Sequence, residues 1–152
     1  MNRNLELLKF IGYLDKDFTK PIQSKPYKVM INPDSLNFKR DNHSLKQENL
    51  SNKTEDQKNT IYDVLNFNLI VDCTGIVDAK RTNMSNEVLG LEYVLYSFKE
   101  NVLKPNFVKI QWGKNTIFKS IPIDFNTTYT LFKPNGDPLR AMITLGFRVL
   151  KT

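Results

Sequence analysis

The chain has 152 residues, of which 40% are hydrophobic and 25% charged, and its net charge is +6. This length predicts one domain around a single hydrophobic core. One cysteine excludes an intrachain disulfide and a cysteine-based zinc site, and one histidine excludes metal sites built from several histidines. A membrane-spanning helix needs about 20 apolar residues in a row, and every apolar run in this sequence is much shorter. Residues 1–18 lack the apolar centre of a signal peptide, which favours a start in the cytoplasm.

Basic side chains are concentrated in the last third of the chain. Residues 1–60 have a net charge of +3, residues 61–102 of −3, and residues 103–152 of +6. The excess is either a solvated face of a basic protein or a surface that meets nucleic acid, an acidic partner or the content of a channel. No helix-turn-helix, zinc-finger or RNP-type motif accompanies it, which weakens the nucleic-acid interpretation.

The first half of the chain predicts two strands and a long polar loop. Residues 5–13 and 27–31 have the apolar periodicity of strands, although the alternation is imperfect in the first. Asp15 and Asp17 are spaced as at the start of a calcium loop, but the rest of the EF-hand pattern does not follow. Residues 41–60 hold only two leucines among polar and charged residues. This segment is either a plain disordered surface loop or one that a partner orders.

The second half of the chain is predicted to contain several strands and one helix. Period-2 alternation over 65–72 and 139–149 predicts two strands, each with one face on the core and the other face more polar. Residues 107–112 and 116–132 continue this pattern, and Pro122 predicts an edge or a bulge.

A helix is predicted over about 86–100. Ser85 can cap it, and Glu87 supplies a negative charge in its first turn. Its apolar stripe has helical spacing and consists of Val88, Leu91, Leu95 and Phe98. Turns at 114–115 and 132–138, the second with Asn135-Gly136, make the final third an antiparallel meander.

Candidate chemistry is sparse. The sequence has no phosphate loop, no Gly-x-Ser-x-Gly elbow and no His-Glu-x-x-His motif. We expect Asp124 to face outward from a strand, Cys73 to be a buried or half-buried strand-end residue, and His43 to be solvated in the polar loop. The sequence therefore predicts no catalytic residue, no cofactor and no metal site.

Five short segments together resemble one family. They are INPDS at 31–35, VDCTG at 71–75, KPNF at 104–107, IQWG at 110–113 and TYTLFKPNGDPLRA at 128–141. They are similar to the N-terminal, tube-like domain of the tube-adaptor proteins of contractile injection systems. These phage-tail-like particles include antifeeding prophages, virulence cassettes and related type VI machines. The resemblance covers residues 3–150, and its longest segment is the most specific.

The resemblance implies a structural protein and no enzyme. Its fold would be mainly β, a small antiparallel β-barrel of two packed sheets with one flanking helix. Six copies would form a ring in the baseplate hub, with a VgrG-like trimeric spike below it and the inner-tube ring above it. Other baseplate proteins are further candidate partners, whereas membrane insertion and specific nucleic-acid binding are not expected. Assembly would take place in the bacterial cytoplasm, in a particle that is released or membrane-anchored.

Many family members continue into a LysM domain, whereas this chain ends at Thr152. We therefore expect a tube-like domain without LysM, and an inner-tube subunit proper is the alternative role. A small basic β-barrel that binds nucleic acid or polysaccharide through the C-terminal meander is a hypothesis from another class.

Two interaction sites follow from the resemblance. In tube proteins the loop after the early strands reaches a neighbouring subunit or ring, and residues 41–60 occupy that place. The candidate residues there are His43, Lys46, Glu48, Lys53, Glu55 and Lys58. We expect this loop to become ordered only in the assembly, and deletion of 44–58 to leave a folded monomer that no longer stacks. The candidate lumen face is the more polar face of the last strand, with Arg140, Thr144 and Arg148.

Overall fold

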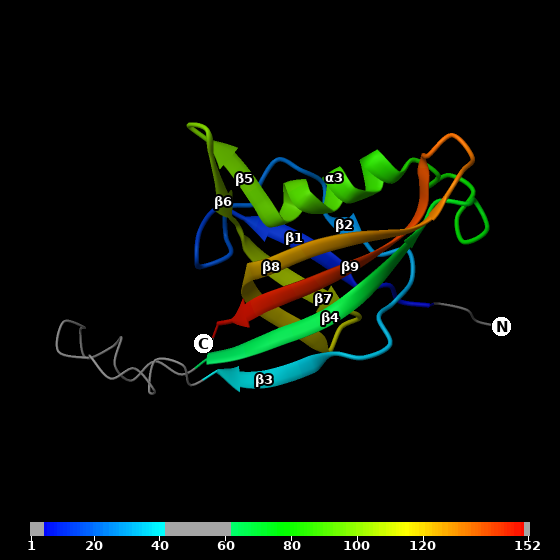
Figure 1. The fold of residues 1–152 in the computed structure, drawn as a ribbon. Helices are drawn as coiled ribbons and strands as arrows, with labels where there is room; N and C mark the ends of the chain where they lie inside the picture. Colours follow the sequence, from blue (N-terminus) through cyan, green and yellow to red (C-terminus); the bar gives the residue numbers. More distant parts are fainter. Residues whose placement is uncertain (1–4, 42–61, 151–152) are drawn as a thin grey trace, which may run out of the picture.

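The computed structural model describes residues 5–41 and 62–150 and consists mainly of antiparallel strands (Figure 1). Seven strands form one sheet of order β2-β1-β7-β8-β9-β4-β3. They are β1 (Lys9–Tyr13), β2 (Tyr27–Lys28), β3 (Asn37–Asp41), β4 (Tyr62–Asp72), β7 (Phe107–Trp112), β8 (Thr116–Phe132) and β9 (Pro138–Val149). The helix α3 (Met84–Leu95) leads into a small second sheet of β5 (Tyr96–Lys99) and β6 (Val102–Pro105).

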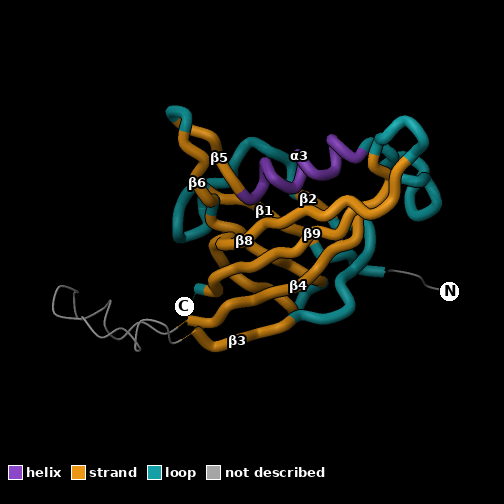
Figure 2. The backbone as a smooth tube through the Cα atoms, viewed as in Figure 1, coloured by secondary structure: helices purple, strands orange, loops and turns teal. Residues whose placement is uncertain are grey.

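The large sheet curls so that strands distant in its order share one core. The ring of Phe10 on β1 stacks on Phe67 of β4 and Phe147 of β9, with centroids 6.2 and 5.8 Å apart. Phe38 on the edge strand β3 contacts Phe118 on β8, with centroids 5.1 Å apart. The helix lies along the curled sheet, and its buried leucines and valine join the same core (Figure 2). The mainly β fold with packed layers and one flanking helix is thus confirmed.

Alternation places the predicted faces correctly on the two central strands. On β9 the buried apolar side chains are Ala141, Ile143, Leu145 and Phe147, and on β4 they are Leu65, Phe67, Leu69 and Val71. These strands pair over ten residues, so the two apolar rows lie side by side. Burial of each large apolar side chain contributes about 1.5–3 kcal/mol to folding, which makes this pair the centre of the core.

The helix prediction over about 86–100 is wrong at its start. α3 begins at Met84, because Asn83 and not Ser85 is the N-cap. The side-chain oxygen of Asn83 accepts from the backbone N–H of Asn86 at 3.0 Å. Such a cap satisfies one of the free N–H groups of the first turn.

The same prediction is wrong at the helix end, because Asn106 terminates the helix at Leu95. Its side-chain amide donates to the carbonyl oxygen of Val94 at 2.9 Å, and its backbone N–H donates to that of Leu95 at 2.8 Å. Residues 96–99 are therefore free to pair with β6. Phe98, assigned to the helical stripe, lies on β5 instead with 69% of its surface exposed.

Other differences concern short strands without alternation. The strand predicted over 27–31 is reduced to the two residues of β2, and that over 5–13 begins only at Lys9. β3, β5 and β6 were not predicted. Pro122 lies at a register shift of β8, which confirms the predicted bulge. Gly136 has a φ of +96° in the predicted turn before β9, a conformation that favours glycine.

Candidate functional site

The outer face of β4, β9 and β8 is polar and mostly uncharged. In the register of these strands, Asn68 lies opposite Thr144, and Thr144 lies opposite Asn126. The same face carries Asn66, Ile70, Thr128, Met142 and, as its exposed acidic residue, Asp124. A surface of amides, hydroxyls and a few apolar groups can form hydrogen bonds with water without strong attraction for ions.

Arg140 and Arg148 lie at opposite ends of this face on β9, and the guanidinium of each contacts a neighbouring side chain. The guanidinium Nε of Arg140 donates to Oδ2 of Asp72 at 3.1 Å, where β9 meets β4. The guanidinium of Arg148 lies over the ring of Tyr62, 4.3 Å from its centroid. Its buried Nε has no hydrogen-bond partner among the described residues. The three residues of the candidate lumen face, Thr144 included, therefore do share one face of the sheet.

The carboxylate of Asp72, the partner of Arg140, accepts several hydrogen bonds. It accepts from the backbone N–H of Thr74 at 3.0 Å and from the hydroxyl of the same residue. Hydrogen bonds from Thr74 and then from Arg140 hold the pKa of Asp72 below its usual range. The carboxylate therefore stays ionised at neutral pH and neutralises Arg140.

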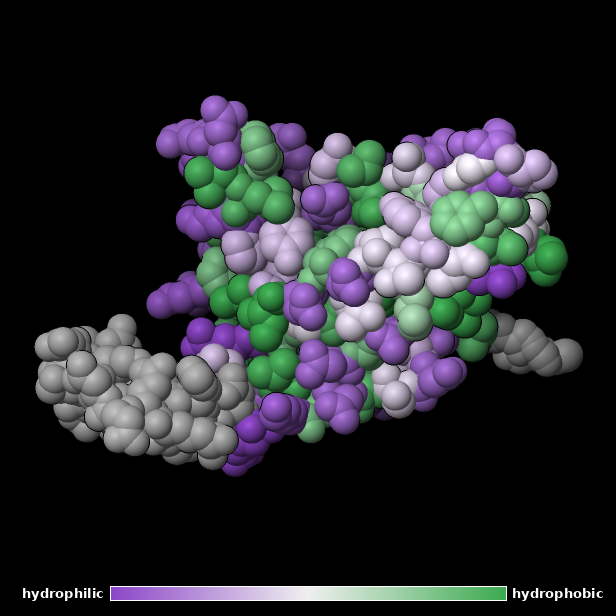
Figure 3. All heavy atoms as spheres, viewed as in Figure 1, coloured by the Kyte–Doolittle hydropathy of each residue, from purple (hydrophilic) through white to green (hydrophobic). Residues whose placement is uncertain are grey.

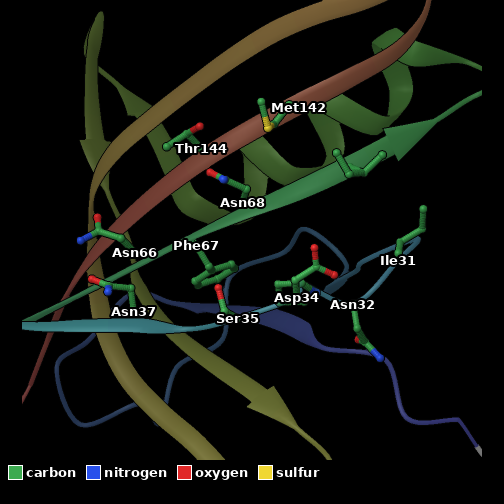
Figure 4. Close-up of a pocket in the computed structure, with 12 residues that line it drawn as sticks. Ile31, Asn32, Asp34, Ser35, Asn37, Asn66, Phe67, Asn68, Met142 and Thr144 are labelled. Carbon is green, nitrogen blue, oxygen red and sulfur yellow. The ribbon is translucent and has the colours of Figure 1, made fainter.

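A shallow groove of about 390 Å³ borders the face, between β4, β9 and the segment that precedes β3 (Figure 4). One wall carries Asn66, Asn68 and Thr144, and the other carries Asp34 and Ser35. Across residues 5–41 and 62–150, no three histidine, cysteine or acidic side chains lie close enough to hold a metal ion.

A model of contractile injection system tube proteins matches residues 4–152. The chain belongs to the contractile injection system tube protein family. No curated protein matches the chain. Members of such a family assemble with other components of the injection system. Within the described part of the chain, no helix is long and apolar enough to cross a membrane.

This tube protein carries an apolar projection. The hairpin of β5 and β6 stands away from the large sheet, and apolar side chains gather on it (Figure 3). Phe98, Val102 and Leu103 expose 69%, 61% and 50% of their surfaces. Glu100 and Asn101 both have positive φ at its tip, as in a two-residue hairpin turn. The sequence pattern did not predict this hairpin, because residues 96–100 were assigned to the end of the helix and residues 102–105 to no element.

A buried charged cluster lies where the helix of the tube protein begins. Glu87 accepts from the hydroxyl of Tyr27 at 3.0 Å and forms an ion pair with Arg81. The Arg81 guanidinium also lies 5.3 Å from the centroid of the Tyr27 ring. Every member of the cluster has a partner, so its role is to anchor α3 on β2.

The remaining predicted residues have ordinary structural roles. Asp15 accepts from the backbone N–H of Thr19 and Lys20, and these hydrogen bonds close its loop. Asp124 is exposed as expected, and Cys73 is buried with a pKa raised chiefly by burial. The loop residues His43, Lys46, Glu48, Lys53, Glu55 and Lys58 lie outside the described residues.

Proposed function

We propose that six copies of the chain form a ring that joins a trimeric spike to the inner tube of the injection system and initiates the tube. The exposed apolar hairpin carries this proposal. A hairpin of two short strands is marginally stable in water, and exposed apolar patches mark contact surfaces. Burial of Phe98, Val102 and Leu103 against a neighbouring subunit would stabilise both the hairpin and the ring.

The two edge strands of the large sheet also support a ring. β2 and β3 are its edge strands, and an exposed edge offers unpaired N–H and carbonyl groups to another chain. Closure of a ring covers such edges in every copy at once.

In this ring, the outer face of β4, β9 and β8 lines the lumen, with Arg140, Thr144 and Arg148 along it. The neutral amides and hydroxyls support this placement, because they let water and cargo pass without tight binding. Asp72 supports it too, since it neutralises Arg140. The inner-tube subunit is the second candidate role, and it differs in that rings continue to stack into a long tube.

Mass measurement of the purified protein tests the ring. Six copies of 17.7 kDa give about 106 kDa. We expect this species for the natural chain, and the monomer mass for the double variant Phe98→Ser/Leu103→Ser. The matched control is Ile76→Ser, because Ile76 is 86% exposed but lies outside the hairpin. A natural chain that stays monomeric at every concentration, or a ring that survives the double variant, would contradict the proposal.

A further inference from the structure

The outer face at the other end of the sheet, over β2, β1, β7 and the start of β8, is rich in lysine. Lys28 lies directly opposite Lys9, and Lys109 lies directly opposite Lys119. Lys9 and Lys109 belong to the same face, because Lys9 pairs with Gln111 and Lys109 with Ile11. We call these four lysines the lysine face.

Among the described residues, none of the four lysines forms an ion pair with a carboxylate. Like charges directly across a strand pair are destabilising. The ion pairs found among the described residues are made by arginine: Arg40 with Asp63, Arg81 with Glu87, and Arg140 with Asp72. Glu6 shares a small groove with Lys9 and Lys28 but forms no ion pair with either within the described part.

Aromatic rings fix two of these lysines on the surface. The ammonium of Lys109 lies 5.5 Å from the centroid of the Tyr13 ring, and that of Lys119 lies 5.4 Å from that of Phe18. Cation–π contacts restrain long side chains and keep their charges at defined places. Lysines that repel one another destabilise the folded chain. We expect such an arrangement on a surface whose counter-charges come from another molecule.

We propose that the lysine face binds a carboxylate-bearing surface of a different protein. A second copy fits poorly, because it carries the same net charge of +6. Apolar side chains between the lysines favour a protein over nucleic acid. Ile117, for example, is 46% exposed on this face, and protein interfaces bury such groups whereas a phosphate backbone does not. The lysine face is distinct from the apolar hairpin and from the outer face of β4, β9 and β8, which the proposed ring uses.

Binding of synthetic polyanions to the full chain tests the lysine face. The probes are poly-L-glutamate, a random copolymer of glutamate and tyrosine, and a single-stranded oligodeoxynucleotide. The test variant is Lys9→Gln/Lys28→Gln/Lys109→Gln/Lys119→Gln. The matched control, Lys16→Gln/Lys80→Gln/Lys104→Gln/Lys133→Gln, removes the same charge from exposed lysines elsewhere. Thermal melts check that each variant is folded. If the quadruple variant is unfolded, the double variants Lys9→Gln/Lys28→Gln and Lys109→Gln/Lys119→Gln replace it.

We expect both glutamate polymers to bind at low salt, the copolymer more tightly. Binding should weaken about tenfold or more in the test variant and about twofold or less in the control. Ile117→Asn should abolish the advantage of the copolymer. Equal weakening in both quadruple variants would overturn the proposal, because net charge alone would then explain binding. Tighter binding of the oligonucleotide at the same lysines would also overturn it and would assign the face to nucleic acid.

Discussion

Arg140 on β9 and Asp72 on β4 are joined by an ion pair, with Nη2 of the guanidinium and Oδ2 of the carboxylate 3.1 Å apart. The two residues are also backbone partners at the last described pairing of β4 with β9. The side chain of Asp72 is 10% exposed, whereas that of Arg140 is 43% exposed. The pair thus fastens the end of the central strands while one charged group still reaches the outer face.

Replacement of Asp72 with asparagine should lower the free energy of unfolding by about 1–2 kcal/mol at neutral pH, because Arg140 is half-exposed and its attraction is partly screened. The pKa of Asp72 is lowered by folding. Its contribution is therefore complete above its ordinary pKa and is lost as the pH falls through the folded-state pKa. Urea unfolding of both proteins at neutral and acid pH should show a difference that disappears in acid. A difference independent of pH would contradict stabilisation by the ionised carboxylate, which Thr74 and Arg140 both bind.

Replacement of Glu87 with glutamine should destabilise the protein by about 2–3 kcal/mol, because it leaves the partly buried Arg81 without its counter-charge. Tyr27→Phe should cost only about 1 kcal/mol, since it removes one hydrogen bond. Burial raises the pKa of Tyr27, so its hydroxyl remains the donor throughout the usual pH range. Urea unfolding at neutral pH compares the two, and an equal or larger effect of Tyr27→Phe would count against the ion pair as the anchor.

Gly12 and Gly90 should respond to alanine with opposite signs. A Cβ at Gly12 would lie 2.6 Å from the carbonyl oxygen of Val94, so α3 would have to move away from β1 at a cost of about 2–3 kcal/mol. A Cβ at Gly90 would lie 3.7 Å from the Tyr27 ring, an ordinary contact. Gly90→Ala should therefore raise stability by up to about 1 kcal/mol through helix propensity. Thermal unfolding measures both, and destabilisation by both would refute this packing of the helix.

Lys28→Gln should raise the free energy of unfolding by about 0.2–1 kcal/mol at low salt, because it relieves repulsion from Lys9. Salt screens surface charges, so the gain should disappear near 1 M. Lys104→Gln on β6 is the control, since Lys104 lies opposite the uncharged Ser97. Urea unfolding at two salt concentrations measures both variants. A gain that persists at high salt would show that repulsion is not its cause.

Sequence periodicity predicted the parts of the fold where one face of a strand is buried. β4 and β9 show the clearest alternation because they pair with each other over the core. Alternation weakens at the edges, and β3 was missed because residues 37–40 are all exposed. The helix end was missed because Asn106, which terminates it, follows 11 residues after Leu95 in the sequence.

The candidate site was predictable in part. Strand parity is a local property, so the sequence placed Arg140, Thr144 and Arg148 on one face correctly. Their partners are not local: Asp72 is 68 residues from Arg140 in the chain. The lysine face was hidden for the same reason, because its four residues come from four strands whose pairing no single segment reveals.

Electron microscopy of the purified natural chain, alone and with its spike and inner-tube proteins, shows whether the chain forms a ring between them. We expect closed rings of six subunits, single when the chain is alone and seated between spike and tube when all three are present. Long tubes of the chain alone would assign it to the inner tube instead. Monomers under every condition, with no density between spike and tube, would contradict the proposed ring.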